Sequence, residues 1–298
     1  MSGSLALRGV YVPVATPFGP SGALDEEALE VLAKGCLEAG ASGIVALSTT
    51  GEATSLDEVE RVAAVDACAR ACASHGSTLI VGAGTNDTRT TIARHEALAD
   101  IPGVAASLAV VPYYVRPSEE AIVAHFKAVA AASPVPVILY NIPYRTGRGL
   151  GAVSLLELAA TDNIVGVKQS VGGVDADTLS LLANKPSGFS VLGGDDPYLL
   201  PLCLMGADGA IAASAHICTE QFVAMIDAGL AGRVEESRRL AEALLPLVLA
   251  LFAEPSPAVI KGVLRAEGRI PTSDLRMPLA AASADAVATA FRARPVPR

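Results

Sequence analysis

A single lysine ends a short apolar run, Ile164–Val167, within this chain of 298 residues. A run of glycine and β-branched residues is typical of a buried strand. Lys168 at the end of such a strand would lose solvent, and loss of solvent disfavours the charged form of an amine. A neutral amine can attack a carbonyl group and form a Schiff base. Because lysine is rarely buried, an ordinary surface lysine just beyond a strand end is the alternative.

Other residues able to do chemistry follow other short apolar runs. They form four motifs: Ser48-Thr49-Thr50-Gly51-Glu52, Pro112-Tyr113-Tyr114, Tyr140-Asn141-Ile142-Pro143-Tyr144-Arg145-Thr146-Gly147 and Gly193-Gly194-Asp195-Asp196. Tyrosine and threonine hydroxyls can pass protons, and an arginine can bind a carboxylate through two parallel hydrogen bonds. Taken separately, each motif is more typical of a structural role, such as a turn with a helix cap, core packing or a surface ion pair. A joint function requires a fold that brings these strand ends together.

The order of the elements indicates such a fold. Short apolar runs alternate with segments of helical periodicity, which implies parallel strands joined by helices. The expected strands cover residues 10–17, 43–47, 78–84, 105–111, 135–140, 164–168, 189–192 and 209–213. The expected helices between and after them cover residues 25–39, 56–73, 88–98, 118–132, 153–160, 197–205 and 220–228, with Asp25, Ser55 and Ser118 as caps.

Eight strands that alternate with helices predict an α/β fold, a (β/α)8 TIM barrel, whose catalytic residues lie at the carboxyl ends of the strands. A doubly wound open sheet is the alternative, but its first strand is usually followed by a glycine-rich phosphate turn, which Thr16-Pro17-Phe18-Gly19 is not. We expect the barrel within residues 1–230. Residues 231–298 are expected to form a C-terminal helical extension packed on it, with helices over 234–252, 256–265 and 284–292.

Composition disfavours several classes of partner. The net charge is −9, whereas nucleic-acid binding requires a basic face. The longest apolar stretch, residues 244–253, is shorter than the roughly 18 residues that span a bilayer. The first seven residues do not predict a secretory signal. The five cysteines are scattered, without a Cys-x-x-Cys pair, so we expect no metal site and a cytoplasmic location. Of the histidines, His216 is expected to be structural, and the others, His75, His95 and His125, to face solvent.

Taken in order, the four motifs and Gly166-Val167-Lys168 resemble those of the dihydrodipicolinate synthase / N-acetylneuraminate lyase family. These are pyruvate-dependent class I aldolases. Each motif alone is weak, but five in the same order are specific. The resemblance runs from Gly9 to the segments Glu254–Pro257 and Leu275–Leu279, which is nearly the whole chain.

The resemblance implies four catalytic residues. Lys168 would form a Schiff base with pyruvate, and Tyr140 beside it would relay protons. Thr49 would link that phenol to a second tyrosine, Tyr114. In the family this second tyrosine comes from a neighbouring subunit.

Four further residues would bind the substrates. Thr50, together with Thr49, matches the site for the carboxylate of pyruvate. Arg145 matches the arginine that binds the carboxylate of the second substrate. Gly194 and Ile211 match backbone positions near that substrate and the lysine.

Arg145 within its motif favours the branch of the family that condenses pyruvate with aspartate-4-semialdehyde to 4-hydroxy-tetrahydrodipicolinate, in lysine biosynthesis. No cofactor is implied beyond the covalent lysine imine with pyruvate. Ser48, Gly193 and Ala212-Ala213-Ser214 depart from the family pattern. One alternative is therefore a related aldolase or dehydratase acting on another aldehyde or on a 2-keto-3-deoxy sugar acid. A non-catalytic barrel that binds a keto acid is a remote alternative. The family implies a homotetramer, a dimer of dimers, or else a homodimer.

Overall fold

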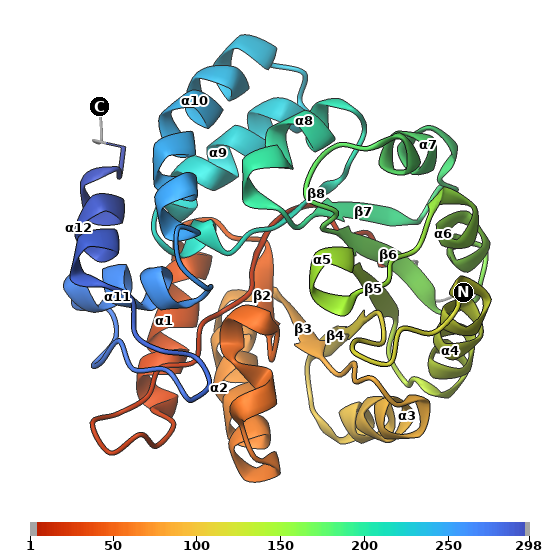
Figure 1. Ribbon diagram of the computed structural model, residues 1–298, viewed down its shortest axis with the longest axis horizontal. Helices are drawn as coiled ribbons and strands as arrows, with labels where there is room; N and C mark the ends of the chain where they lie inside the picture. The colour runs from red at the N-terminus through yellow and green to blue at the C-terminus, as the bar shows by residue number, and fades with distance from the viewer. Residues whose placement is uncertain (1–4, 296–298) are drawn as a thin grey trace. The chain divides into compact units, whose positions relative to one another are not determined.

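The computed structural model describes residues 5–295, and its eight strands are ordered β1 to β8 in a closed barrel (Figure 1). The strands are β1 (Gly9–Val12), β2 (Gly43–Ala46), β3 (Thr78–Gly82), β4 (Val104–Val110), β5 (Val137–Asn141), β6 (Ile164–Gln169), β7 (Ser190–Gly193) and β8 (Gly209–Ile211). The predicted (β/α)8 barrel is thus confirmed. The outermost residues of the two predicted domains, 1–4 and 296–298, lie outside the described residues, as does most of the segment considered for a secretory signal.

The α-helices are α1 (Glu26–Glu38), α2 (Glu58–His75), α3 (Thr88–Glu96), α4 (Glu119–Ala132), α5 (Pro143–Thr146), α6 (Ala152–Ala159), α7 (Ala176–Asn184), α8 (Leu199–Leu204), α9 (Thr219–Leu230), α10 (Val234–Leu251), α11 (Ala258–Ala266) and α12 (Ala284–Arg292). Asp25 and Ser118 accept hydrogen bonds from the first turns of α1 and α4, so these predicted caps are confirmed. The predicted cap of the second helix is wrong. Asp57, rather than Ser55, caps α2 and forms a capping box with Glu60.

Two compact units make up the described chain. The first unit contains the described residues up to Gly9 and Ile80–Ile211; the second contains Val10–Leu79 and the described residues from Ala212 onward. In the second unit, α10 packs against α9, and α12 packs against α10 and α11 (Figure 1). The boundary expected at residue 230 stays a prediction. Within residues 5–295, no helix is long and apolar enough to cross a membrane.

The first unit shows how strand alternation separates core from site. Side chains along a strand point alternately to opposite faces. Leu139, Val167 and Val191 pair in register across β5, β6 and β7, and they join a buried apolar cluster with Phe126 of α4. Each such buried side chain contributes roughly 1.5–3 kcal/mol. The next residues along β5 and β6, Tyr140 and Lys168, therefore face away from the helices.

Three of the four histidines are buried. The expectation that His95 and His125 face solvent is wrong: they are 0% and 6% exposed, because α3 packs against α4. Burial lowers the pKa of His125 to about 4, and its Nδ1 lies 2.9 Å from the Thr88 hydroxyl. His216 is structural, as predicted. Its Nε2 accepts a hydrogen bond from the Ala15 amide at 2.9 Å, and burial lowers its pKa to about 4.

Candidate active site

Lys168 is buried rather than exposed, so the surface-lysine alternative is wrong. It is 4% exposed and lies in β6, in register with Tyr140 of β5. Its Nζ lies 4.2 Å from the centre of the Tyr140 ring, and Tyr140 is 6% exposed. Among the described residues, Lys168 forms no ion pair with a carboxylate, so its amine is not committed to a salt bridge. The structure thus places a buried amine against a phenol, and these are groups that can form imines and exchange protons.

The outer faces of β5 and β6 carry an amide chain that fixes these strand ends. Asn141 donates a hydrogen bond to the Gln169 side-chain oxygen at 3.1 Å, and Gln169 donates to Thr178 at 2.9 Å. The Asn141 side chain also donates to the Leu150 carbonyl and accepts from the Leu150 amide, both at 3.0 Å. Because Leu150 ends the loop that follows β5, these bonds fix both ends of the segment that carries Arg145. Nothing in the sequence pattern indicated this role.

Gly194 lies directly against the lysine. Its amide donates to the Gln169 carbonyl at 2.9 Å, which extends the pairing of β6 and β7 beyond the strands. A Cβ atom at this position would lie 2.1 Å from Ser170 Oγ and 2.7 Å from Lys168 Cε. Only glycine fits here without displacing the lysine chain. Ser170 is fully buried, and its hydroxyl has no hydrogen-bond partner within the described part of the chain.

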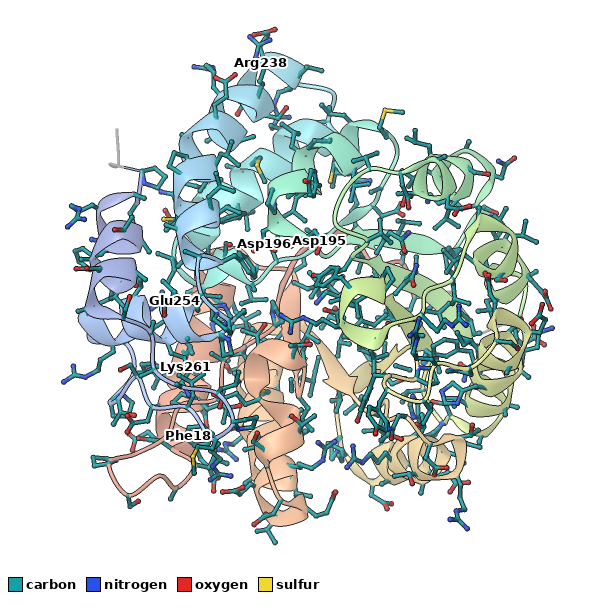
Figure 2. All side chains as sticks on the ribbon, viewed as in Figure 1. Phe18, Asp195, Asp196, Arg238, Glu254 and Lys261 are labelled. Atoms are coloured by element: carbon teal, nitrogen blue, oxygen red, sulfur yellow. The ribbon has the colours of Figure 1, made fainter. Side chains whose placement is uncertain are left out.

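Three loops of the first unit meet at Asp195, which follows β7 (labelled in Figure 2). Tyr144 donates from its hydroxyl to Asp195 Oδ1 at 2.9 Å, and the Gly172 amide donates to Oδ2 at 2.6 Å. Burial and the neighbouring Asp195 carboxylate raise the pKa of Tyr144, so it remains a phenol. Asp195 makes no side-chain hydrogen bond to the short 3-10 helix that follows, so its side chain does not cap that helix. Arg145 is exposed on α5, and its guanidinium lies 6.0 Å from the Tyr144 ring.

Two further predicted site residues of the first unit differ in exposure, since Tyr114 lies at the surface and Ile211 is buried. Tyr114 is 87% exposed, and its φ of 71° is in the left-handed region, which is unfavourable for a bulky residue. Ile211 is fully buried at the end of β8. The structure therefore does not bring Tyr114 against Lys168 within the first unit.

The threonine pair lies in the second unit, directly after β2. Residues Thr49–Gly51 form a single 3-10 turn, in which Thr50 is 4% exposed and Thr49 is exposed. The Thr16 hydroxyl donates to the Gly51 carbonyl at 2.7 Å. The proposed link from Thr49 to Tyr140 stays a prediction.

The side chains around Lys168 offer an amine, a phenol and hydroxyls, which are groups for proton transfer and covalent catalysis. No cluster of three histidine, cysteine, aspartate or glutamate side chains suited to a metal ion occurs within residues 5–295. Sequence reasoning singled out the lysine and Tyr140, and their catalytic roles stay predictions. It missed Ser170 and the Tyr144–Asp195 contact, although Tyr144 and Asp195 both lie inside recognised motifs.

Comparisons with known proteins bear on this arrangement. A sequence profile described as the Dihydrodipicolinate synthetase family matches residues 6–292. The 4-hydroxy-tetrahydrodipicolinate synthase of Moorella thermoacetica is 38% identical over 274 residues, covering 92% of each chain. The crystal structure of dihydrodipicolinate synthase from Thermotoga maritima has a TM-score of 0.92 and 31% identity, covering 96% of this chain and 97% of that chain. A variant described as the first monomeric dihydrodipicolinate synthase has a TM-score of 0.91 and 31% identity, covering 96% and 95%.

The profile covers almost the whole chain, and the relatives match along nearly their full length. This agreement extends over the strands and loops that carry Lys168, Tyr140, Arg145 and Gly194. The chain therefore belongs to the dihydrodipicolinate synthetase family.

Proposed function

We propose that this chain is a 4-hydroxy-tetrahydrodipicolinate synthase, which condenses pyruvate with aspartate-4-semialdehyde through a lysine imine. The observation that carries this proposal is the buried Lys168 amine, 4.2 Å from the Tyr140 ring, with no carboxylate to pair with it among the described residues. Relatives along nearly the full length of the chain carry the same name. No resident cofactor is needed for this chemistry, because the lysine itself activates pyruvate.

The chemistry follows from the amine and the phenol. The Lys168 amine attacks the keto carbon of pyruvate, and the resulting carbinolamine loses water to give a protonated imine. The imine withdraws electrons, so the methyl group loses a proton and becomes an enamine carbon that attacks the aldehyde. The amino group of the second substrate then attacks the imine carbon, closes the ring and releases Lys168. In this proposal Tyr140 donates and accepts protons in the first steps.

The binding roles complete the proposal. Thr49 and Thr50 bind the carboxylate of pyruvate, and Thr49 passes protons between Tyr140 and Tyr114. Arg145, exposed on α5, attracts the carboxylate of the aldehyde substrate. The backbone at Gly194 and Ile211 lines the space beside Lys168. The five cysteines are buried and unpaired, which supports a reducing cytoplasm as the location.

The test is reductive trapping followed by a substrate panel. With pyruvate and borohydride, we expect one stable adduct on the peptide that contains Lys168, found by mass spectrometry. In steady-state assays, aspartate-4-semialdehyde should be the preferred partner of pyruvate. Absence of the adduct would refute the lysine mechanism, including its aldolase variants, and leave a non-catalytic keto-acid-binding barrel.

One observation keeps a second candidate in the panel. The hydroxyl of Ser170 is buried beside Gly194 without a hydrogen-bond partner among the described residues, and such a group is costly unless a ligand satisfies it. A substrate rich in hydroxyls, such as a 2-keto-3-deoxy sugar acid, would supply the missing bond. An adduct on Lys168 together with faster turnover of the sugar acid would favour this related aldolase over the synthase.

Tyr114 supports the proposal that the active protein is an oligomer, a homotetramer or a homodimer. An 87% exposed aromatic side chain on a left-handed backbone is suited to contact a neighbouring subunit. If Tyr114 acts in the partner's site, Tyr114→Phe and Lys168→Ala chains should complement each other. A mixed dimer has one intact site, so up to about half of the wild-type rate should return.

Differently tagged chains, co-expressed and purified on both tags in succession, provide the mixed species for this measurement. Tyr113→Phe, at the neighbouring position, is the matched control and should retain activity without complementation. Purified mixed dimers that stay inactive would contradict a role in trans, and a monomer that retains full activity would contradict the oligomer itself.

A further inference from the structure

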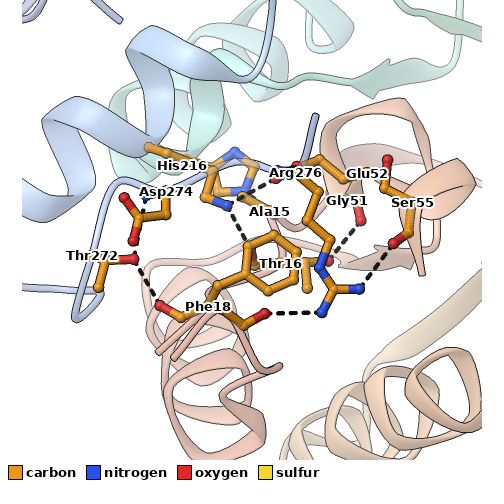
Figure 3. A network of polar contacts seen from close by, with 12 residues as sticks. Ala15, Thr16, Phe18, Gly51, Glu52, Ser55, His216, Thr272, Asp274 and Arg276 are labelled. Carbon is orange, nitrogen blue, oxygen red and sulfur yellow. Dashed lines mark hydrogen bonds and ion pairs between the residues drawn. The ribbon is translucent and has the colours of Figure 1, made fainter. Parts of the chain in front are cut away.

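A buried glutamate, Glu52, directly follows the 3-10 turn formed by Thr49–Gly51, called the threonine turn below. Glu52 is 2% exposed, and its backbone lies in the left-handed region with φ 51° and ψ 35°. A non-glycine residue in this conformation costs roughly 1–2 kcal/mol and persists only where its surroundings hold it. The surroundings that hold Glu52 come from the C-terminal part of the second unit (Figure 3).

The first of these surroundings is Lys261 of α11. Its Nζ donates to Glu52 Oε1 at 2.8 Å and to the Thr16 carbonyl at 2.9 Å, and both charged side chains are completely buried. The same Nζ lies 4.3 Å from the centre of the Phe18 ring (Phe18 and Lys261 are labelled in Figure 2). Burial lowers the pKa of Lys261, and the Glu52 carboxylate opposes that effect. The ammonium thus has two oxygen acceptors and one aromatic face.

The second is Arg276, which follows α11. Its backbone amide donates to Glu52 Oε2 at 2.9 Å, so each carboxylate oxygen has its own donor. Its guanidinium donates to the Ser55 carbonyl at 2.9 Å and to the Gly22 carbonyl at 3.0 Å, and it also pairs with Glu60. The Arg276 guanidinium therefore binds the chain just beyond the turn, and the Arg276 amide binds Glu52.

These contacts hold the carboxyl end of the Thr49–Gly51 turn. Thr16 connects the turn to Lys261. Its hydroxyl donates to the Gly51 carbonyl, and its own carbonyl accepts from the Lys261 ammonium. Thr49 and Thr50 directly precede Gly51 and the anchored Glu52. A buried ion pair is often no more stabilising than an apolar pair of the same shape, whereas it fixes orientation through directional bonds. The bonds from Lys261 and Arg276 to Glu52 therefore fix the orientation of the turn.

We propose that Glu52, Lys261 and Arg276 are positioning residues that hold the Thr49–Thr50 turn in the geometry that binds the carboxylate of pyruvate. The C-terminal helices would thereby set the affinity for the first substrate without touching it. This inference rests on the proposed function, which assigns that carboxylate to Thr49 and Thr50.

The central variant is Lys261→Met, which keeps an unbranched side chain one atom shorter and removes its donors. We expect the KM for pyruvate to rise at least tenfold. The kcat at saturating pyruvate should fall less than threefold, and the KM for the aldehyde should stay unchanged, because Lys168, Tyr140 and Arg145 lie in the other unit. Lys261→Arg, which retains a donor, should restore part of the pyruvate affinity.

Lys185→Met is the matched control. Lys185 forms a partly buried ion pair with Asp208 at 2.9 Å. Both residues precede their strands, β7 and β8, and so lie at the amino-terminal ends of these strands. We expect this variant to lose stability with the KM for pyruvate unchanged. If Lys261→Met folds poorly, the double variant Glu52→Gln/Lys261→Met removes both charges; it should recover thermal stability relative to Lys261→Met while the pyruvate KM stays raised.

A second readout needs no substrate. Hydrogen–deuterium exchange of the peptide containing residues 48–52 should speed up in Lys261→Met and stay unchanged in Lys185→Met. Folded Lys261→Met with unaltered exchange in this peptide and unaltered pyruvate KM would overturn the positioning role. Wild-type protein that forms no adduct with pyruvate would instead overturn the proposed function, and the exchange measurement would still decide whether the three residues hold the turn.

Discussion

Replacing Lys168 by alanine is expected to lower kcat/KM by about 10⁴-fold, which corresponds to ~5 kcal/mol of lost transition-state stabilisation. The reason is chemical, because no other described amine lies beside Tyr140 on β5 and β6. Removal of the nucleophile eliminates the covalent path, and a bound keto acid alone does not lower the same barrier. Borohydride should trap no pyruvate on the variant.

Two comparisons isolate the amine from its packing. Lys168→Arg keeps a long cationic chain that cannot form an imine, and it should be as inactive as the alanine variant. Lys127→Ala breaks a half-exposed ion pair with Glu157 on the surface, where such pairs contribute about 0–1 kcal/mol, and it should retain wild-type kinetics. A Lys168→Ala protein that turns over within tenfold of wild type would refute the covalent mechanism.

Gly194→Ala is expected to lower kcat at least about 10²-fold while the fold survives, because a displacement of about 1 Å at a reacting group costs this much. The new Cβ would lie 2.1 Å from Ser170 Oγ, 2.7 Å from Lys168 Cε and 2.8 Å from Lys168 Cγ, closer than real Cβ contacts allow. Something must therefore move, and both neighbours are buried. Overpacking of this kind costs roughly 1–3 kcal/mol in the free energy of unfolding, measured by urea titration.

Gly173→Ala is the matched control, since nothing lies within 4 Å of the Cβ it would add. It should leave kcat and stability unchanged. The double variant Ser170→Ala/Gly194→Ala removes the nearest clash but not the one with the lysine, so it should recover stability and remain slow. Gly194→Ala with kcat within threefold of wild type would show that the lysine tolerates displacement.

Local patterns were sufficient for most of the fold. Asp25 and Ser118 were recognisable as caps, and the last helix, Ala284–Arg292, was predicted with its observed bounds, because each depends on residues within one or two turns. Two helices were missed for local reasons as well. The α5 helix has only four residues, too few for a period, and α7 stands between a Gly-Gly pair and a proline, which are residues that favour loops.

Contacts between distant segments could not be predicted. Lys261 and Glu52 are 209 positions apart, and nothing in either neighbourhood indicates the other. His95 and His125 were misjudged for the same reason, since only the packing of α3 on α4 buries them. Motif comparison did indicate that Tyr140 lies beside Lys168, because it uses the order of five motifs instead of local periodicity. It gave no indication of residues, such as Ser170, that the motifs leave out.

The contact between Lys261 and Glu52 has a consequence for synthesis on the ribosome. The chain emerges from its amino terminus, so the glutamate leaves the exit tunnel 209 residues before its lysine. Until then neither of its donors, Lys261 nor the Arg276 amide, is available to the carboxylate. Lys168 emerges well before Lys261 as well. Under the proposed function, a nascent chain therefore carries the Lys168 amine before the residues that position the pyruvate-binding turn have been synthesised.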